Sequence, residues 1–225
     1  MASLVNLLPR VALLLAVAFP ASAATLEVLM HLADGRPVAD AVVTLQGPAG
    51  VPTGVPRADM DQRGQRFAPH VLAVHTGTQV RFPNSDNIRH QVYSFSAAKR
   101  FELRLYEGTP TEPLLFDKPG VVVLGCNIHD WMLGYIYVTD DPRFGVSDAQ
   151  GRVRLEQLPP GDYHATLWHP QLADMQPVDG GTLHVPAAGL SHRVVLSLEP
   201  VSEDLPPTPT AFGDAFNRAA RETAQ

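Results

Sequence analysis

Cys126, His129 and Met132 are the residues of this sequence best suited to carry chemistry, and they stand together in one short stretch. They place a thiolate, an imidazole and a thioether at the spacing C-x2-H-x2-M. The apolar runs at residues 121–124 and 134–138 predict a strand on each side, so the loop between them is held at both ends. Thiolate and thioether donors favour copper over hard cations, and two histidines, one cysteine and a weak axial methionine are typical of a blue copper centre. The sequence therefore predicts a mononuclear copper site that needs a second histidine.

His90 is the best candidate for that second histidine. It lies between expected strands at residues 80–82 and 92–95, so it would reach the site from a separate element. His70 and His75 are five residues apart on one expected strand and would point to opposite faces. His164 and His169 have the same spacing. The remaining histidines lie in segments that we assign to a second domain: His31, His184 and His192.

Other interpretations of the same residues are weaker. A lone buried cysteine such as Cys126 is common, and a methionine three residues after a histidine is often core packing. A cysteine protease needs its cysteine and histidine on separate elements with a third orienting group, whereas here they share one loop. Zinc would prefer a further nitrogen or sulfur donor to a thioether. Three donors in order on one loop therefore favour copper.

At these residues the sequence resembles the cupredoxins. The ligand loop has the short spacing of amicyanin in the plastocyanin class, and residues 82–86 leading to His90 are similar to the strand and loop before the first histidine ligand. The combination also resembles exported plastocyanin-like proteins labelled methylamine-utilisation proteins, a label that does not establish a substrate. The resemblance covers about residues 60–138 and implies that His90, Cys126 and His129 are equatorial ligands and Met132 the axial one.

One residue departs from the cupredoxin pattern. The residue after the first histidine is usually an asparagine that ties the two ligand loops together, and here it is Gln91. The sequence alone leaves open whether the longer amide of Gln91 also connects the two ligand loops. Because hydrogen bonds around the ligands tune a metal site, the rigidity of the loops and the reduction potential depend on the answer.

The flanks carry a second resemblance. Residues 34–38 with 41–45 look like the first hairpin of transthyretin-like domains of the carboxypeptidase-regulatory type, and residues 147–163 look like the middle of the same domain. About a hundred residues separate the two pieces. This separation predicts a copper domain inserted into a small sandwich, a domain type that usually serves as a binding or structural module.

The first 23 residues have the layout of a secretory signal peptide. Arg10 precedes an apolar run at residues 11–19, and the small residues 21–23 form a cleavage site. The run is too short to span a bilayer, and no twin-arginine pair is present, so we expect Sec-type export to the periplasm with no stable membrane insertion after cleavage. The alternative is an uncleaved anchor. Cleavage after Ala23 would change the net charge from −6 to −7 by removing Arg10.

Composition restricts the partners and the fold class that the chain can have. No basic stripe is present, which argues against nucleic acid as a partner, and the lone cysteine cannot form an intrachain disulfide. Many short strands separated by Gly and Pro turns predict an all-β fold of sandwiches. The expected units are a signal peptide (1–23), a cupredoxin Greek-key sandwich (60–138), a transthyretin-like sandwich in two parts around it (24–50 and 140–200), and a Pro-rich linker and tail (201–225).

The sequence also predicts the structure of individual segments. Strands at residues 26–32 and 38–45 form a hairpin, residues 47–59 form a linker, and residues 96–119 are irregular. In the tail, residues 211–223 form either a short amphipathic helix or a frayed end.

The predicted function is one-electron transfer with a redox protein partner. A copper carrier or buffer is the first alternative, and an interaction module with a structural copper is the second. An enzyme is not expected, because no substrate-activating acid or base or open metal position is evident.

Overall fold

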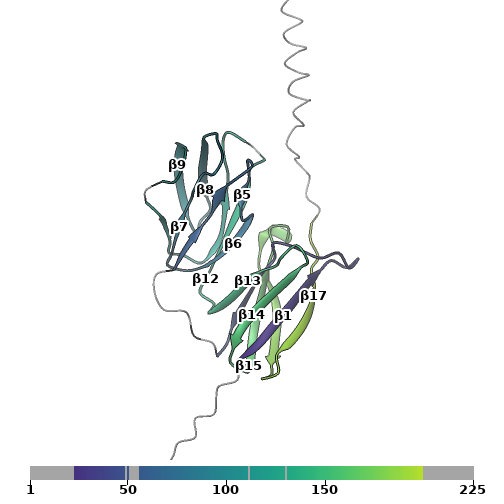
Figure 1. The fold of residues 1–225 in the computed structure, drawn as a ribbon. Coiled ribbons are helices and arrows are strands. Elements are labelled where there is room, and N and C mark those ends of the chain that lie inside the picture. The colour runs from purple at the N-terminus through teal and green to yellow at the C-terminus, as the bar shows by residue number, and fades with distance from the viewer. Residues whose placement is uncertain (1–22, 49, 51–55, 111, 130, 200–225) are drawn as a thin grey trace, which may run out of the picture.

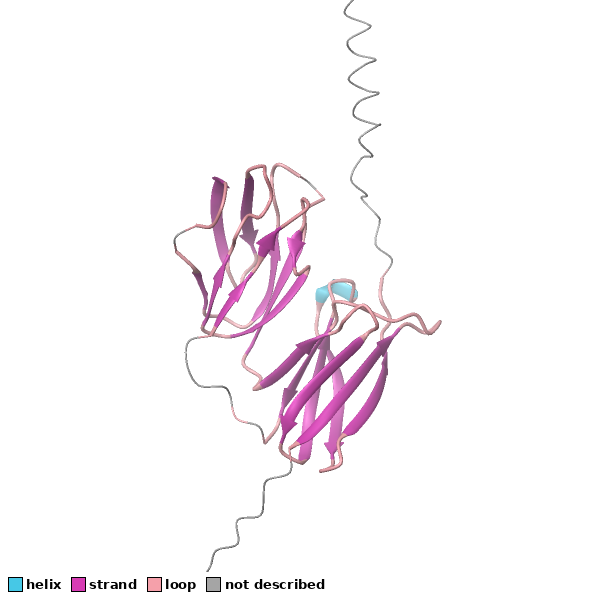
Figure 2. Ribbon diagram, viewed as in Figure 1, coloured by secondary structure: helices cyan, strands magenta, loops and turns pink. Residues whose placement is uncertain are grey.

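The computed structural model describes residues 23–48, 50, 56–110, 112–129 and 131–199. Within these residues the chain forms strands and one short 3-10 turn, η1 (Ala173–Met175), and no α-helix (Figure 2). The predicted all-β fold is therefore confirmed. The described part also contains no helix long and apolar enough to cross a membrane. The expected signal peptide, apart from Ala23, and the expected tail helix lie outside the described residues.

Seven strands, drawn from both ends of the described chain, build one sandwich, which we call the outer sandwich (Figure 1). One sheet has the order β14-β1-β17 and the other the order β13-β2-β15-β16. β1 pairs antiparallel with β14, and β2 pairs antiparallel with both β13 and β15. The strands are β1 (Ala24–His31), β2 (Val42–Gln46), β13 (Arg143–Val146), β14 (Arg152–Leu158), β15 (Gly161–Trp168), β16 (Val178–Val185) and β17 (Leu190–Val195).

The chain between β2 and β13 builds a second sandwich, the inserted sandwich, from shorter strands. Its sheets have the orders β10-β7-β3, β11-β12-β6, β4-β5 and β8-β9. β12 pairs parallel with β6 and antiparallel with β11. The strands are β3 (Arg57–Asp59), β4 (Asp61–Gln62), β5 (Phe67–Ala68), β6 (Val71–His75), β7 (Thr78–Arg81), β8 (His90–Phe95), β9 (Arg100–Tyr106), β10 (Leu114–Phe116), β11 (Gly120–Leu124) and β12 (Gly134–Thr139).

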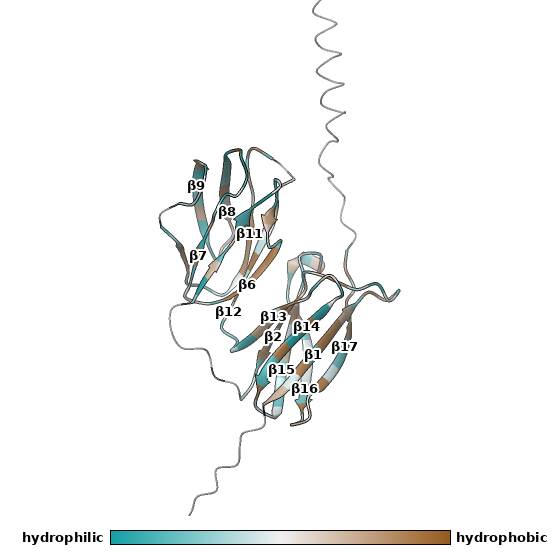
Figure 3. Cartoon of the chain, in the orientation of Figure 1, coloured by the Kyte–Doolittle hydropathy of each residue, from teal (hydrophilic) through white to brown (hydrophobic). Residues whose placement is uncertain are grey.

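Each sandwich has its own apolar core. In β1 every second residue is buried, as expected when one face of a strand packs on a core, and Figure 3 shows β1 and β6 coloured mainly as apolar. The outer core takes its buried residues from positions 24–45 and 153–196 and includes Leu26, Leu45 and Tyr163. The inserted core takes its residues from positions 60–138 and includes Phe116 and Ile136. Each set of strands thus buries its own apolar face.

A smaller apolar cluster joins the two sandwiches. Val71 and Tyr137 of the inserted sandwich are buried against Val42 and Trp168 of the outer one. The rings of Tyr137 and Trp168 lie 5.3 Å apart between centroids. A polar contact also links the two sandwiches, a hydrogen bond of 3.0 Å between His70 Nδ1 and an Asp40 carboxylate oxygen. The sandwiches therefore meet over a packed apolar surface.

Several expected elements differ from the structure. β1 and β2 do not form a hairpin, because they belong to opposite sheets and only an isolated bridge links His31 and Pro37. The chain crosses between the sheets where the Ser147 hydroxyl accepts from Ala41 N–H at 2.8 Å and donates to the Val38 carbonyl at 2.7 Å. Such a long-range hydrogen bond leaves no local sequence signal.

Three segments for which no strand was predicted contain strands. Arg57–Asp59, placed in the linker, forms β3 and pairs with β7; of the rest of that linker, residues 49 and 51–55 lie outside the described part. The stretch 96–119, expected to be irregular, contains β9 and β10. β13 was not expected, and it pairs with β2. Phe101 and Leu103 of β9 are only half-buried, so their alternation marks a weak apolar face rather than a core strand.

Candidate metal centre

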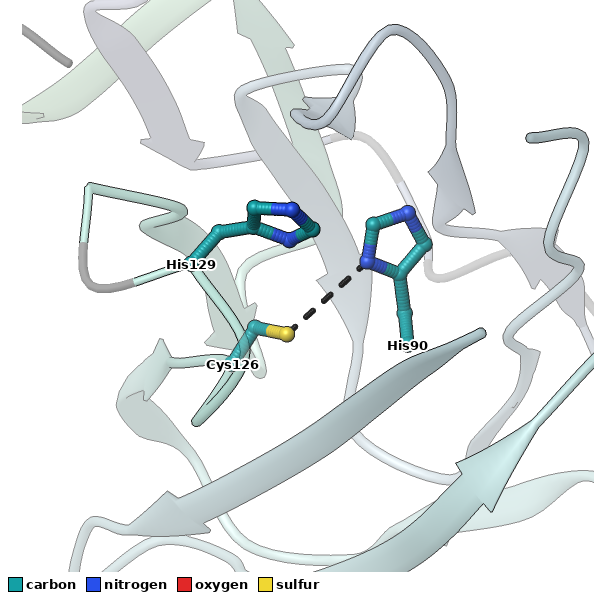
Figure 4. Close-up of side chains that lie close together, drawn as sticks. All are labelled: His90, Cys126 and His129. Atoms are coloured by element: carbon teal, nitrogen blue, oxygen red, sulfur yellow. Dashed lines mark hydrogen bonds between the residues drawn. The ribbon is translucent and has the colours of Figure 1, made fainter. Parts of the chain in front are cut away.

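Strand β8 and the loop between β11 and β12 bring three of the four predicted ligands together: His90, Cys126 and His129. His90 is the first residue of β8, Cys126 lies two residues after β11 ends, and Met132 lies two residues before β12 begins. Figure 4 shows the side chains of His90, Cys126 and His129 pointing toward a common point. Because β11 and β12 pair along their whole length, the loop that carries Cys126 and His129 is closed at its base.

A backbone bridge fixes the cysteine strand against the strand of His90. Tyr93 N–H donates to the Gly125 carbonyl at 3.1 Å, and Gly125 N–H donates to the Tyr93 carbonyl at 3.0 Å. The Tyr93 ring lies directly over Gly125, so a Cβ at this position would come within 2.7 Å of the ring. A larger residue at this position would displace the Tyr93 ring, so glycine suits the close pairing of Tyr93 with the residue before Cys126.

The donor atoms have the spacing of a metal site. Ligand atoms of His90, Cys126 and His129 all lie within 4.8 Å of one another. Cys126 Sγ and His90 Nδ1 are 3.9 Å apart, as the dashed line in Figure 4 marks. Bond lengths of about 2.0–2.3 Å to nitrogen and sulfur place two donors of a trigonal site about 3.8 Å apart. The distance between Cys126 Sγ and His90 Nδ1 matches that value, and the three residues together could hold a metal ion.

Burial supports the same interpretation. The His90 side chain is fully buried and Cys126 is 3% exposed. His129 is only partly buried as a residue, but its Nδ1 atom is buried and has no hydrogen-bond partner among the described residues. A buried polar atom without a partner costs free energy, on the order of 1–3 kcal/mol. A metal ion held at Nδ1 would remove that cost.

His90 is oriented by a carboxylate that the sequence did not reveal. Its Nε2 lies 2.8 Å from an Asp86 carboxylate oxygen, which leaves Nδ1 to face Cys126. Metal-binding histidines usually donate their other ring N–H to such a group, which fixes the tautomer and the ring. Asp86 lies in an irregular loop, so its distance of four residues from His90 gave no indication of contact.

Asp86 is itself held in place. Backbone N–H groups of Gly64 and Gln65 donate to its two oxygens at 2.6 and 2.9 Å. Partial burial raises its pKa, but the hydrogen bonds from Gln65, His90 and Gly64 outweigh burial and hold the pKa below the usual value. The carboxylate therefore stays ionised beside His90.

Gln91, the residue after His90, links β8 to the ligand loop. Its Oε1 accepts a hydrogen bond of 2.8 Å from Asn127 Nδ2, the side chain next to Cys126. Its Nε2 donates to Glu102 on β9 at 2.7 Å. The longer amide thus bridges the two loops, which settles the point that the sequence left open.

Burial also favours the neutral, metal-binding form of His129. Desolvation lowers the pKa of its imidazole, the neighbouring His90 lowers it further, and Asp86 opposes both. The ring centroids of His90 and His129 lie 5.1 Å apart, and those of His129 and Trp131 also lie 5.1 Å apart. Tyr106 pairs with His90 across β8 and β9. Burial raises the pKa of Tyr106 to about 12, so its hydroxyl stays protonated and donates to the Phe82 carbonyl.

The fourth predicted ligand, Met132, is buried in the same apolar cluster as Cys126, with 1% of its surface exposed. Its backbone N–H donates to the His129 carbonyl at 2.9 Å, which closes the loop into a tight turn. His70, His75 and His169, by contrast, lie near the junction of the two sandwiches, where they contact Tyr135, Phe144 and Ala39.

Comparisons with solved structures find cupredoxins. The chain is similar to a purple cupredoxin from Nitrosopumilus maritimus at 21% identity and a TM-score of 0.33, over 36% of this chain and 99% of that one. It is similar to a reduced Cu(I) form of an amicyanin variant at 20% identity and a TM-score of 0.33, over 43% and 98% of the two chains. A copper-containing nitrite reductase from Thermus scotoductus matches at 25% identity and a TM-score of 0.35, over 50% of this chain and 28% of the reductase.

No protein-family model matches the chain, and no curated protein matches it. The donor atoms and their surroundings, rather than these partial likenesses, carry the assignment of a metal.

Proposed function

We propose that this protein is an exported carrier of single electrons with one mononuclear copper ion held by His90, Cys126, His129 and Met132. The observation that carries the proposal is the convergence of one thiolate and two imidazoles on a buried point, with an unpartnered Nδ1 on His129. Copper bound there would supply a one-electron couple between Cu(II) and Cu(I). Soft donors and imidazoles suit copper better than hard cations.

The surrounding residues favour electron transfer over metal delivery. Asp86, the Gln91–Asn127 hydrogen bond and the Tyr93–Gly125 bridge hold the donors before any metal arrives. A site that barely moves between two oxidation states suits a carrier that cycles repeatedly. A copper carrier needs an accessible ion that exchanges, whereas His90 and Cys126 are buried.

The partly exposed edge of His129 gives the site a contact with the surface. Ile128 is 52% exposed and Leu133 is 47% exposed, so apolar side chains flank the ligand loop. Weak redox encounters use small interfaces of this kind. This apolar rim supports a role in brief encounters with a redox protein.

A visible absorption spectrum of the copper-loaded protein tests the site. Thiolate ligation by Cys126 should give an intense charge-transfer band, and Cys126→Ser should abolish it. Met132→Leu should keep the colour and raise the potential, because the axial bond that favours Cu(II) is lost. Weak absorption in the wild type would exclude a trigonal thiolate site.

A Cu(I) chelator separates the electron carrier from the copper carrier. We expect repeated reduction and reoxidation with no loss of copper to the chelator at moderate excess. Rapid, stoichiometric release of Cu(I) on reduction would instead establish metal delivery.

A further inference from the structure

The loop between β7 and β8 carries Asp86 and leads directly into His90. Its residues 82–89, all of which the structure describes, contain no strand. Its backbone makes only isolated bridges to other described segments, from Asn84 to Gln62 and from Asn84 to Gly108. A loop without a ladder of backbone hydrogen bonds has many conformations open to it unless other groups hold it. The position of the Asp86 carboxylate, and with it the orientation of the His90 ring, therefore depends on side chains that hold this loop.

Asn84 holds the loop from within. The residue is buried, with 6% of its surface exposed. Its Nδ2 donates to the Ile88 carbonyl at 2.9 Å and to the Tyr106 carbonyl at 3.0 Å. Its Oδ1 accepts from Asp86 N–H at 3.0 Å, so both donors and the acceptor of the amide are used. One side chain therefore ties the backbone of Asp86 and Ile88 to the end of β9.

Gln62 and Tyr106 hold the first residues of the loop. Gln62 is fully buried, and its backbone N–H and its side-chain Nε2 both donate to the Pro83 carbonyl, at 3.0 and 3.1 Å. The same Nε2 donates to the Tyr106 hydroxyl, which in turn donates to the Phe82 carbonyl at 2.8 Å. Two consecutive carbonyls of the loop are therefore held by side chains from β4 and β9.

Gln62 also connects the loop to the turn that holds Asp86. β4 pairs with β5, and the N–H groups of Gly64 and Gln65 in the turn between them bind the Asp86 carboxylate. The Gln62 carbonyl accepts from Ser85 N–H at 2.9 Å, one residue before Asp86. Gln62 therefore joins the two segments that fix Asp86, its own loop and the β4–β5 turn.

We call Gln62, Asn84 and Tyr106 the polar brace. Core packing alone does not account for it, because Gln62 Oε1 is buried and has no hydrogen-bond partner among the described residues. A polar atom in this state costs free energy that an apolar side chain of similar size would avoid. Buried polar groups connected into a network can instead hold their surroundings in one conformation. A glutamine at position 62 is therefore explained better by the loop that it holds than by the stability of the core.

We propose that the polar brace positions the copper site by holding the Asp86 carboxylate against His90 Nε2. This inference rests on the proposed function, because it treats His90 as a copper ligand. The contacts run from the brace to the Asp86 backbone, and from the Asp86 carboxylate to the ring, which leaves His90 Nδ1 facing Cys126. The brace also borders the strand of the ligand, since Tyr106 pairs with His90 across β8 and β9. The fold rather than the metal then orients the ring, and copper binds to a ring that is already in place.

The metal-free, full-length protein gives the first test. Nitrogen-15 NMR of the His90 ring at pH 8 reports which ring nitrogen carries the proton. We expect one tautomer, with the proton on Nε2, in the wild type and a mixture of tautomers in Asn84→Ala and in Tyr106→Phe, which deletes only the hydroxyl. Tyr163→Phe is the matched control, because Tyr163 is a buried tyrosine of the outer sandwich whose hydroxyl donates to the Pro159 carbonyl at 2.7 Å. Its His90 signals should match those of the wild type.

Copper affinity gives the second test. Competition against a chelator of known affinity should show a loss of about tenfold in Asn84→Ala and of several-fold in Tyr106→Phe, with no loss in Tyr163→Phe. In an Asp86→Ala background, Asn84→Ala should cause no further loss, because the brace acts through that carboxylate. A full additional loss in the double variant would show that Asn84 acts on the core rather than on His90, and would overturn the proposal.

The remaining outcomes separate the brace from the copper site itself. A single His90 tautomer and unchanged copper affinity in both Asn84→Ala and Tyr106→Phe would overturn the brace. A wild type that holds His90 in one tautomer, loses this order in the two variants and gives no charge-transfer band with copper would refute the proposed function and leave the brace in place. Urea unfolding shows which variants are folded, and Tyr106→Phe carries the test if Asn84→Ala does not fold.

Discussion

At the scale of single residues, two side chains that would not touch the metal hold the candidate site: Asp86 contacts the ring of His90, and Asn127 donates a hydrogen bond to Gln91. Cys126 and His129 share a loop whose spacing can be read directly, and His90 follows by elimination of the other histidines. Asp86 and Asn127 could not be predicted as supports, because each contact joins loops whose relative position depends on the whole sandwich. Supporting residues of this kind can be identified only once the fold is known, because polar residues in loops do not repeat with the period of a helix or a strand.

Asp86 should contribute to copper affinity without touching the metal. Asp86→Ala removes the acceptor of His90 Nε2 and frees the ring to rotate, so we expect copper affinity to fall about 10- to 100-fold. Competition against a chelator of known affinity measures the change. Asp162→Ala is the control, because Asp162 makes a similar contact of 2.6 Å with His184 on the exposed surface of the outer sandwich. Unchanged affinity in Asp86→Ala would show that core packing alone orients His90.

At the scale of elements, the strands next to the ligands were predictable and the weaker strands were not. β11 and β12 are continuous apolar runs, which are buried and easily recognised, whereas β9 and β13 have no fully buried residue. β1 and β2 were predicted as strands, but their pairing was wrong, because which strands pair depends on the sandwich and not on the intervening turn. Sequence period thus identifies strands better than it identifies their partners.

The tie between β8 and the ligand loop should affect the rate of copper loss. Gln91→Ala removes the acceptor of Asn127 while leaving the Tyr93–Gly125 bridge in place. We expect the loop to loosen and copper to dissociate several-fold faster, since a neutral hydrogen bond contributes about 1 kcal/mol. Stopped-flow transfer of copper to a chelator measures the rate. Gln91→Asn restores the shorter amide usual in cupredoxins; a Gln91→Ala protein that keeps its copper as long as the wild type would show that the bridge alone fixes the loop.

At the scale of the whole molecule, two cores that form from different parts of the chain meet over a small apolar cluster with histidines near its edge. His169 is 7% exposed, and its Nδ1 accepts a hydrogen bond of 3.1 Å from Gln171 N–H. Burial lowers its pKa and His70 lowers it further, while the Ala39 carbonyl and Asp40 oppose this. The folded protein therefore favours neutral His169.

Acid should destabilise the protein through His169. At a pH above about 6.5 the imidazole is neutral in both the folded and the unfolded chain, so its contribution is complete. As the pH falls below that value the unfolded chain binds the proton first, and the free energy of unfolding decreases until the pH reaches the lowered pKa of the folded state. Urea midpoints at pH 8 and pH 5.5 measure the loss, which should be smaller in His169→Gln. His164 is an exposed histidine of β15, the strand that ends just before His169, so His164→Gln should lose as much as the wild type. An equal loss in His169→Gln would contradict this prediction.

The insertion itself can be tested by cutting the chain at its two junctions. Residues 56–139 contain all four proposed ligands and the whole core of the inserted sandwich, so we expect this fragment to fold and to give the same copper charge-transfer band as the full chain. The fragment should be less stable than the full chain at the face that Trp168 covers, because excision exposes Val71 and Tyr137 to water. The fragment should therefore unfold at a lower urea concentration than the same sandwich in the full chain, or self-associate as its concentration rises. Tyr137→Ser should relieve the association in the fragment. A fragment that folds but gives no band would show that the outer sandwich shapes the copper site, and that the two sandwiches act as one functional unit.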